Sequence, residues 1–132
     1  MKHFSKEEFR GWYDLLHPEL KDKLDEFRER LGRPVSISPA EGSLGRHLGD
    51  SSKSYHNVDK YHGLLAVDVM PATDDMKRCF RLAKTVGFGG IGLYSHWKPR
   101  WGMHLDVRPK AQKARWYATV NCKTGEQEYT YL

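Results

Sequence analysis

The sequence predicts an α+β fold in which N-terminal helices pack on one side of a small, mostly antiparallel sheet. Apolar residues recur with helical spacing in the first third of the chain, whereas short runs of strand-forming residues fill the last third. The length of 132 residues fits one domain with one hydrophobic core, and no internal repeat or linker divides it. We therefore expect a single domain over residues 1–132.

Three helices are expected, each with a start or stop signal. Ser5 opens a capping box, and the apolar face that follows it predicts a first helix. Pro18 suits the first position of a second helix, which Gly32 ends. Residues 73–75 cap a third helix that closes at Gly87. The apolar faces of these helices are expected to form the core.

The expected strands are short. Residues 35–38 alternate in polarity, and residues 64–70 form an apolar run that one acid interrupts. A long polar stretch at 39–61 separates these two strands, and in a small domain such a stretch is usually functional or disordered. Four more strands are expected in the last third, at residues 90–94, 103–107, 115–120 and 128–131.

The composition narrows the class of protein. Apolar residues make up 39% and charged residues 30%, and no stretch approaches the roughly 20 apolar residues of a membrane span, so we expect no membrane insertion. The two cysteines form no CxxC pair, which argues against a zinc knuckle, and a disulfide between them is unsupported. The chain starts without the apolar segment of a secretory signal, so we expect synthesis in the cytoplasm.

The net charge of +5 favours a polyanionic partner, such as nucleic acid, anionic lipid or an acidic cell-wall polymer. The lysines and arginines are scattered and form no sustained run, so the charge does not single out nucleic acid. A basic nucleic-acid-binding domain is therefore kept only as an alternative. The sequence leaves the oligomeric state open.

Asp68 is the sharpest local anomaly. It lies inside the apolar run, on a strand face that it shares with Leu64, Ala66 and Met70. An ionised carboxylate that is buried without a partner is very costly, so Asp68 requires a cation. A salt bridge and a bound metal ion both meet that requirement.

A second polar face lies further along the chain. His104, Asp106 and Arg108 project from one side of the predicted strand, and apolar residues occupy the other side. This pattern is typical of the floor of a site, although an edge strand that faces solvent would produce it too.

The long polar loop contributes a histidine, His56, shortly before the strand that carries Asp68. Two imidazoles and one carboxylate are a common set of catalytic zinc ligands, with the fourth position left for water. A zinc ion would supply the cation that Asp68 requires. We therefore predict that Zn²⁺ is the cofactor and that His56, Asp68 and His104 hold it.

Four short motifs follow one another along the chain: Ser54-Tyr55-His56, Ala66-Val67-Asp68, Gly89-Gly90-Ile91-Gly92-Leu93-Tyr94 and His104-Leu105-Asp106. In this order they resemble the zinc D-alanyl-D-alanine peptidase family, which includes bacterial carboxypeptidases and phage L-alanyl-D-glutamate endolysins. The resemblance implies a hedgehog/DD-peptidase-like fold with its core at 33–108, and a metallopeptidase that cleaves peptidoglycan stem peptides.

The chain departs from the family pattern at two places. Family members usually have the first His seven residues before the Asp, whereas His56 lies twelve residues before Asp68 and His62 lies six before it, which makes His62 a rival ligand. We prefer His56 because the Ser-x-His motif lies there. Trp101 and Gly102 occupy the positions at which family members carry a proton-transfer group, so the resemblance does not assign the general base.

Asp106 is the first candidate for the catalytic base, because it lies on the same face as His104. Its alternative role is to orient an imidazole. His96, in the loop before that strand, is the second candidate, and its alternative is an ordinary exposed histidine.

Arg46, Ser54 and Arg108 are the candidate substrate-binding residues. A guanidinium matches carboxylate geometry, and stem peptides carry carboxylates; the resemblance places an Arg before the Ser-x-His motif, where Arg46 lies. Either Arg is otherwise a surface ion-pair member. Tyr94, Trp97 and Trp101 are expected to line a substrate groove or the core.

The leading prediction is a peptidase of phage or prophage origin that acts on the cell wall after release from the cell or as part of a virion. The second hypothesis keeps the fold and the metal but not the activity, as a structural or tail-associated module, because Trp101 replaces an expected acid.

Overall fold

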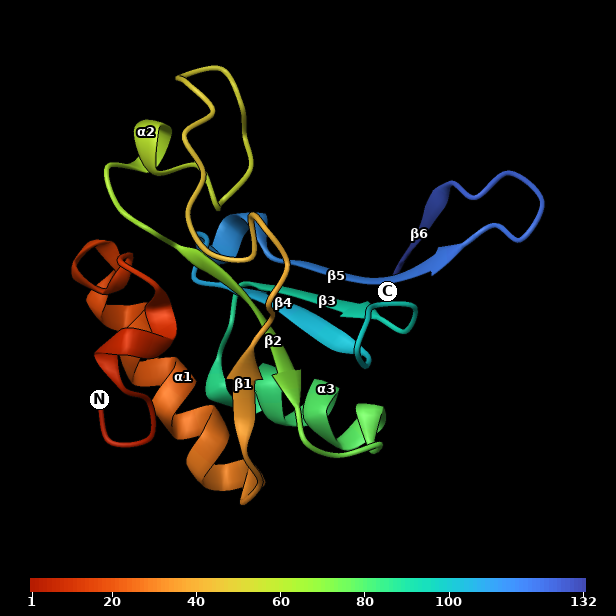
Figure 1. Ribbon diagram of the computed structural model, residues 1–132, viewed down its shortest axis with the longest axis horizontal. Helices are drawn as coiled ribbons and strands as arrows, with labels where there is room; N and C mark the ends of the chain where they lie inside the picture. The colour runs from red at the N-terminus through yellow and green to blue at the C-terminus, as the bar shows by residue number, and fades with distance from the viewer.

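The computed structural model describes residues 1–132 and has an α+β architecture built on a six-stranded mixed sheet, with strand order β1-β2-β4-β3-β5-β6 (Figure 1). Four of the five strand pairings are antiparallel, and β3 runs parallel to β5. The predicted class and the mostly antiparallel sheet are therefore confirmed. The strands are β1 (Val35–Ile37), β2 (Ala66–Pro71), β3 (Gly90–Tyr94), β4 (Gly102–Asp106), β5 (Ala114–Val120) and β6 (Gln127–Tyr131).

Two helices, α1 (Pro18–Leu31) and α3 (Met76–Val86), cover one face of the sheet (Figure 1). Their local signals are confirmed. Gly32 ends α1 in the left-handed region at φ 69°, and the Asp75 side chain accepts a hydrogen bond from the Arg78 N–H at the start of α3. The core lies between these helices and the sheet, and it includes Leu20, Phe27, Val67, Val69, Cys79, Ile91, Met103 and Leu105.

The first predicted helix is wrong in its extent. The capping box at Ser5 is present, but the segment forms two 3₁₀ helices, η1 (Lys6–Phe9) and η2 (Tyr13–Leu15). Arg10 and Gly11 both have positive φ, at 48° and 92°, and this backbone conformation cannot continue a helix. The break still lets Phe9 reach the core.

The opposite face of the sheet carries the polar residues. Strand pairing places Asp68 opposite His104, His104 opposite Gly92 and Gly92 opposite Trp116, so one row crosses four strands. Because side chains alternate along a strand, the next residues in each strand face the helices instead. The polar face therefore lies over the sheet centre, away from the core.

The polar loop between β1 and β2 arches over this face and contains the short helix α2 (Val58–Tyr61) (Figure 1). Its first part is tied to β2, because the Ser38 N–H donates to the Asp68 carbonyl and the Asp68 N–H donates to the Ser43 carbonyl, both at 2.9 Å. Its two arms are also joined: the Arg46 N–H donates to the His56 carbonyl at 2.8 Å. The loop is therefore held in place by backbone hydrogen bonds.

The other end of the sheet is an arm formed by β5 and β6, which extends away from the helices (Figure 1). Every residue of β6 is exposed. A third 3₁₀ helix, η3 (Lys110–Gln112), joins β4 to this arm. None of the helices has the length and apolar character needed to cross a membrane.

Candidate metal centre

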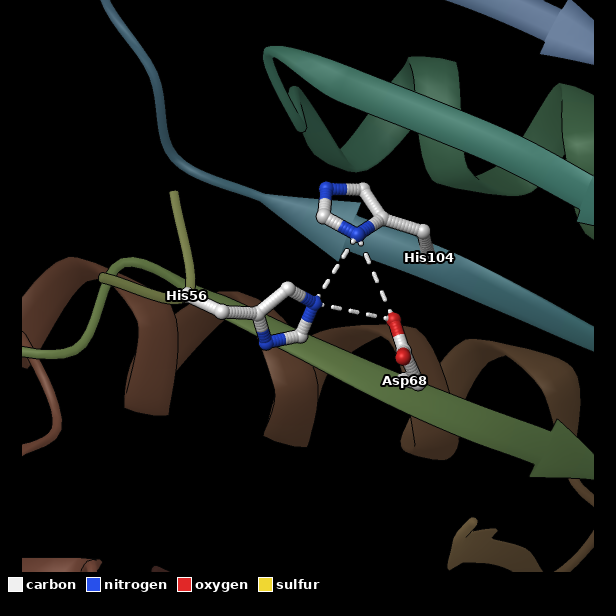
Figure 2. Close-up of side chains that lie close together, drawn as sticks. All are labelled: His56, Asp68 and His104. Carbon is white, nitrogen blue, oxygen red and sulfur yellow. Dashed lines mark hydrogen bonds and ion pairs between the residues drawn. The ribbon is translucent and has the colours of Figure 1, made fainter. Parts of the chain in front are cut away.

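Three buried side chains converge above the centre of the sheet, as Figure 2 shows. Asp68 comes from β2, His104 from the neighbouring strand β4, and His56 from the loop above them. His56 Nε2, His104 Nδ1 and one Asp68 oxygen lie 3.2 Å from one another in every pairing. The three atoms therefore form a nearly equilateral triangle.

In each imidazole one nitrogen points into the triangle and the other, the outer nitrogen, points away from it. The hydrogen-bond partner of the outer nitrogen determines which nitrogen carries the proton. His56 Nδ1 lies 2.6 Å from the Leu44 carbonyl oxygen, and His104 Nε2 lies 2.7 Å from an Asp106 oxygen. Both oxygens only accept hydrogen bonds here, so a neutral imidazole carries its proton on these outer nitrogens. The two inner nitrogens of such neutral rings present lone pairs to each other and to Asp68, and a metal ion between the three atoms would satisfy all of them.

The triangle fits a small tetrahedral metal ion. Zinc binds imidazole nitrogen and carboxylate oxygen at about 2.0–2.1 Å, so two ligand atoms of a tetrahedron lie roughly 3.3–3.4 Å apart. The observed separations of 3.2 Å match this geometry. Asp68 makes no ion pair with a Lys or Arg, and its charged partners are the two histidines. The buried His56, Asp68 and His104 group can therefore hold a metal.

Asp106 lies behind His104 and is completely buried, at 0% exposure. Its carboxylate accepts from His104 and from the Arg108 guanidinium at 2.6 Å. Burial alone would raise the pKa of Asp106, but these two partners lower it well below its ordinary value. For metal-free His104, burial opposes the charged form, yet Asp106 and Asp68 raise its pKa to about 9. The Asp106 charge thus acts directly on the imidazole.

The glycine-rich motif on β3 makes room for these groups. A Cβ at Gly90 would lie 2.1 Å from an Asp106 oxygen, and a Cβ at Gly92 would lie 2.4 Å from the Trp116 indole. Gly92 lies opposite His104, so the indole passes over it and reaches the His104 ring, with ring centroids 5.2 Å apart. The motif therefore leaves the space that the side chains of β4 and β5 fill.

The metal centre opens into a cavity of about 800 Å³. Four cationic side chains line it, whereas its only carboxylates are Asp68 and Glu41, and Glu41 makes no ion pair in the structure. The cavity is therefore positively charged apart from the metal ligands. Its cations are Arg46, Lys53, Lys98 and Arg108.

The structure places the predicted site residues at different depths. Arg46, Ser54 and Arg108 line the cavity. Asp106 does not line it, because His104 and Arg108 cover this carboxylate. His96 does not line it either, and its Nε2 lies 2.8 Å from the Gln127 amide oxygen.

The rival ligand His62 lies away from the converging side chains, and the predicted aromatic residues divide between the cavity and the core. His62 is exposed, has left-handed φ at 53° and lies outside the converging group. Tyr94 and Trp97 line the cavity, whereas Trp101 belongs to the core and its indole donates to the Thr73 carbonyl at 2.7 Å.

Sequence reasoning missed the part of the cavity wall that follows β4. The residues are Gln112, Trp116, Gln127 and Tyr129. The alternation along β5 could have shown that Trp116 and Tyr117 face opposite sides of the sheet. It could not show that β5 pairs with β3 rather than with an outer strand. Only that parallel pairing brings the indole over the sheet centre.

Comparison with known proteins gives one match. The family model with the description Peptidase M15 matches residues 4–106, a range that contains all three converging side chains and ends at Asp106. Searches of curated proteins and of solved structures gave no significant match.

Proposed function

Because this chain belongs to the peptidase M15 family, we propose that it is a zinc-dependent metallopeptidase that hydrolyses an amide bond in the stem peptide of peptidoglycan. The observation that carries the proposal is the convergence of two imidazole lone pairs and a buried carboxylate at the floor of a cationic cavity. A zinc ion held there would polarise a peptide carbonyl and lower the pKa of water enough for attack near neutral pH.

Asp106 has the position of a group that orients His104. It is buried behind the imidazole, and both its partners hold it in the ionised form. This placement supports the second of the two roles considered for Asp106, since a base has to reach water in the cavity. Glu41 lines the cavity and is free of ion pairs, so we assign proton transfer to Glu41.

The charges of the cavity support an anionic peptide as substrate. Arg46 holds the Gly42 carbonyl through Nε at 2.8 Å, and Arg108 uses Nε and Nη2 on Asp106. Both residues line the cavity and keep guanidinium N–H groups that no protein acceptor uses, and guanidinium groups bind carboxylates in a fixed geometry. Ser54 completes this wall beside His56. Stem peptides supply the carboxylates that such a wall would bind.

We place the activity at the cell wall, after release from the cell or as part of a virion, in a phage or prophage lytic role. The excess of positive charge supports attraction to an acidic wall polymer.

A second candidate is a zinc-binding module without catalytic activity. It is favoured by Trp101, which occupies a position where related peptidases carry an acid and whose indole is committed to the core. Both candidates require the metal, so hydrolysis separates them.

The test combines metal analysis with a digest of peptidoglycan. We expect about one zinc per purified chain and the appearance of new amino termini when the protein is incubated with purified peptidoglycan, and mass spectrometry of the products identifies the bond. The matched control is His104→Ala, which should lose both zinc and hydrolysis. Bound zinc without any hydrolysis would favour the inactive module, and a chain without zinc would contradict both candidates.

A further inference from the structure

The Tyr94 hydroxyl has a hydrogen that no group of the protein uses. Tyr94 ends β3, is 9% exposed and lines the cavity. Its oxygen lies 2.9 Å from Trp116 Nε1. An indole N–H can only donate, so the Tyr94 oxygen is the acceptor in this bond and keeps its own hydrogen for another partner. No carbonyl or carboxylate of the chain accepts that hydrogen.

The ring is held firmly beside the metal centre. It stacks on Trp97, with centroids 4.1 Å apart and planes 15° apart. The indole that donates to Tyr94 also contacts the His104 ring. In the sheet, Tyr94 lies two residues beyond Gly92, the partner of His104, so it faces the same side as the metal ligands. The hydroxyl therefore has a fixed position at the edge of the site.

The protonation state suits a hydrogen-bond donor. Burial is the largest cause that raises the pKa of Tyr94. The negative charge of nearby Asp68 raises this pKa further, the hydrogen bond from the Trp116 N–H lowers it, and the pKa is about 12. Tyr94 therefore keeps its proton around neutral pH, where its hydroxyl can donate a hydrogen bond.

We propose that Tyr94 is a catalytic residue that donates a hydrogen bond to the carbonyl oxygen of the scissile amide, with Trp116 as the positioning residue that fixes its hydroxyl. This inference rests on the proposed peptidase function. As water adds to the carbonyl carbon, the carbonyl oxygen gains negative charge, and a donor already in place stabilises that charge without reorganisation. The proton stays on Tyr94 throughout, so the step requires no further reactant.

The experiment compares Tyr94→Phe with Tyr117→Phe. Tyr117 lies on the opposite face of neighbouring β5, where it packs against the core, so the control removes a hydroxyl outside the cavity. For Tyr94→Phe we expect kcat to fall about 10²-fold, with KM changed less than about threefold and zinc content unchanged. Tyr117→Phe should match the wild type in all three.

A second readout is independent of turnover. The probe is a phosphinic pseudopeptide of the bond that the peptidoglycan digest identifies, because its tetrahedral anion mimics the charge of the transition state. Tyr94→Phe should weaken phosphinate binding by the same factor as kcat/KM, while binding of the cleaved product peptide should stay the same. Trp116→Phe removes the positioning N–H together with part of the indole but leaves the Tyr94 hydroxyl, so it should lose less, and adding it to Tyr94→Phe should cause little further loss.

The outcomes separate this inference from the proposed function. A wild type that releases no amino termini overturns both. An active wild type together with an equally active Tyr94→Phe, or with unchanged phosphinate affinity, overturns the role of Tyr94 and leaves the peptidase intact. Loss of zinc or equal loss of product binding in Tyr94→Phe would show that the residue only supports the structure, and it would equally overturn the inference.

Discussion

Polar side chains are buried at one end of the sheet's polar face and exposed at the other end. At the β2–β4 end, Asp68, His104 and Asp106 are buried, and each has a charged or hydrogen-bonded partner. On the β5–β6 arm, Gln127 and Tyr129 reach the same cavity from a strand that is exposed along its whole length. The first region lies within residues 4–106, which the family model matches, and the second lies outside them.

The difference follows from the cost of burial. A buried charge without a partner costs several kcal/mol. Each buried polar group at the metal end therefore requires a neighbour that is charged or forms a hydrogen bond with it. An exposed side chain on the arm keeps its contact with water, so its replacement changes little except the contact with substrate. We infer that the metal end determines whether the chemistry takes place, and that the arm adjusts which substrate fits.

The largest effect is expected at the ligand that the sequence left in doubt. His56→Ala removes one of three lone pairs that meet at one point, so zinc should be lost and peptidase activity should fall roughly a thousandfold, because the Lewis acid contributes several kcal/mol. Elemental analysis and the peptidoglycan digest measure both. His62→Ala is the matched control, because His62 is exposed, and it should keep both. The opposite result for the two variants would move the ligand to His62.

A smaller effect is expected one step further from the metal. Asp106→Asn keeps the shape of the side chain but removes the charge that pairs with the His104 N–H and with Arg108, so zinc affinity should fall about 10- to 100-fold. Competition with a chromophoric chelator measures this.

Asp59→Asn provides the control for that variant. Asp59 also contacts a histidine, His47, at 2.7 Å, but this pair lies at the surface away from the cavity. Its zinc affinity should be unchanged. A similar loss in both variants would mean that the charge of Asp106 has no specific effect on His104.

The metal end is tightly packed, so an added methyl group there should reduce the stability of the protein. Gly90→Ala would place a methyl group 2.1 Å from an Asp106 oxygen, and the buried carboxylate cannot move away without breaking its bonds to His104 and Arg108. We expect the free energy of unfolding in urea to fall by about 1–3 kcal/mol. In Gly63→Ala the nearest new contact is at 3.5 Å, so this variant should unfold as the wild type does. Equal stability of both variants would contradict the tight packing.

The smallest effect is expected on the arm. Tyr129 is 49% exposed and lines the cavity, so Tyr129→Ala should raise KM about fivefold, equivalent to about 1 kcal/mol of binding, with kcat and zinc content unchanged. Tyr131 is on the same strand but 74% exposed and outside the cavity, and Tyr131→Ala should leave KM unchanged. A fall in kcat for Tyr129→Ala would remove the distinction between the two ends of the sheet.

Elements whose signals are local could be predicted from the amino-acid sequence. The proline at the start of α1, the glycines that end α1 and α3, and the alternation in β4 act through neighbours along the chain, and the structure has each of them. Asp68 could be recognised as needing a cation because the apolar residues on both sides predict burial. The polar face of β4 was visible for the same reason, since alternation assigns each side chain to a face.

Contacts between distant segments could not be predicted in this way, because they depend on the folded arrangement of the chain. The backbone conformation at Arg10 and Gly11 breaks the first predicted helix although its capping box is intact. The path of the long loop brings His56 to Asp68 and leaves His62 in solvent, and the parallel pairing of β5 with β3 brings Trp116 over Gly92. These are contacts between segments far apart in the chain, and they depend on strand pairing and loop closure, which residue spacing does not encode.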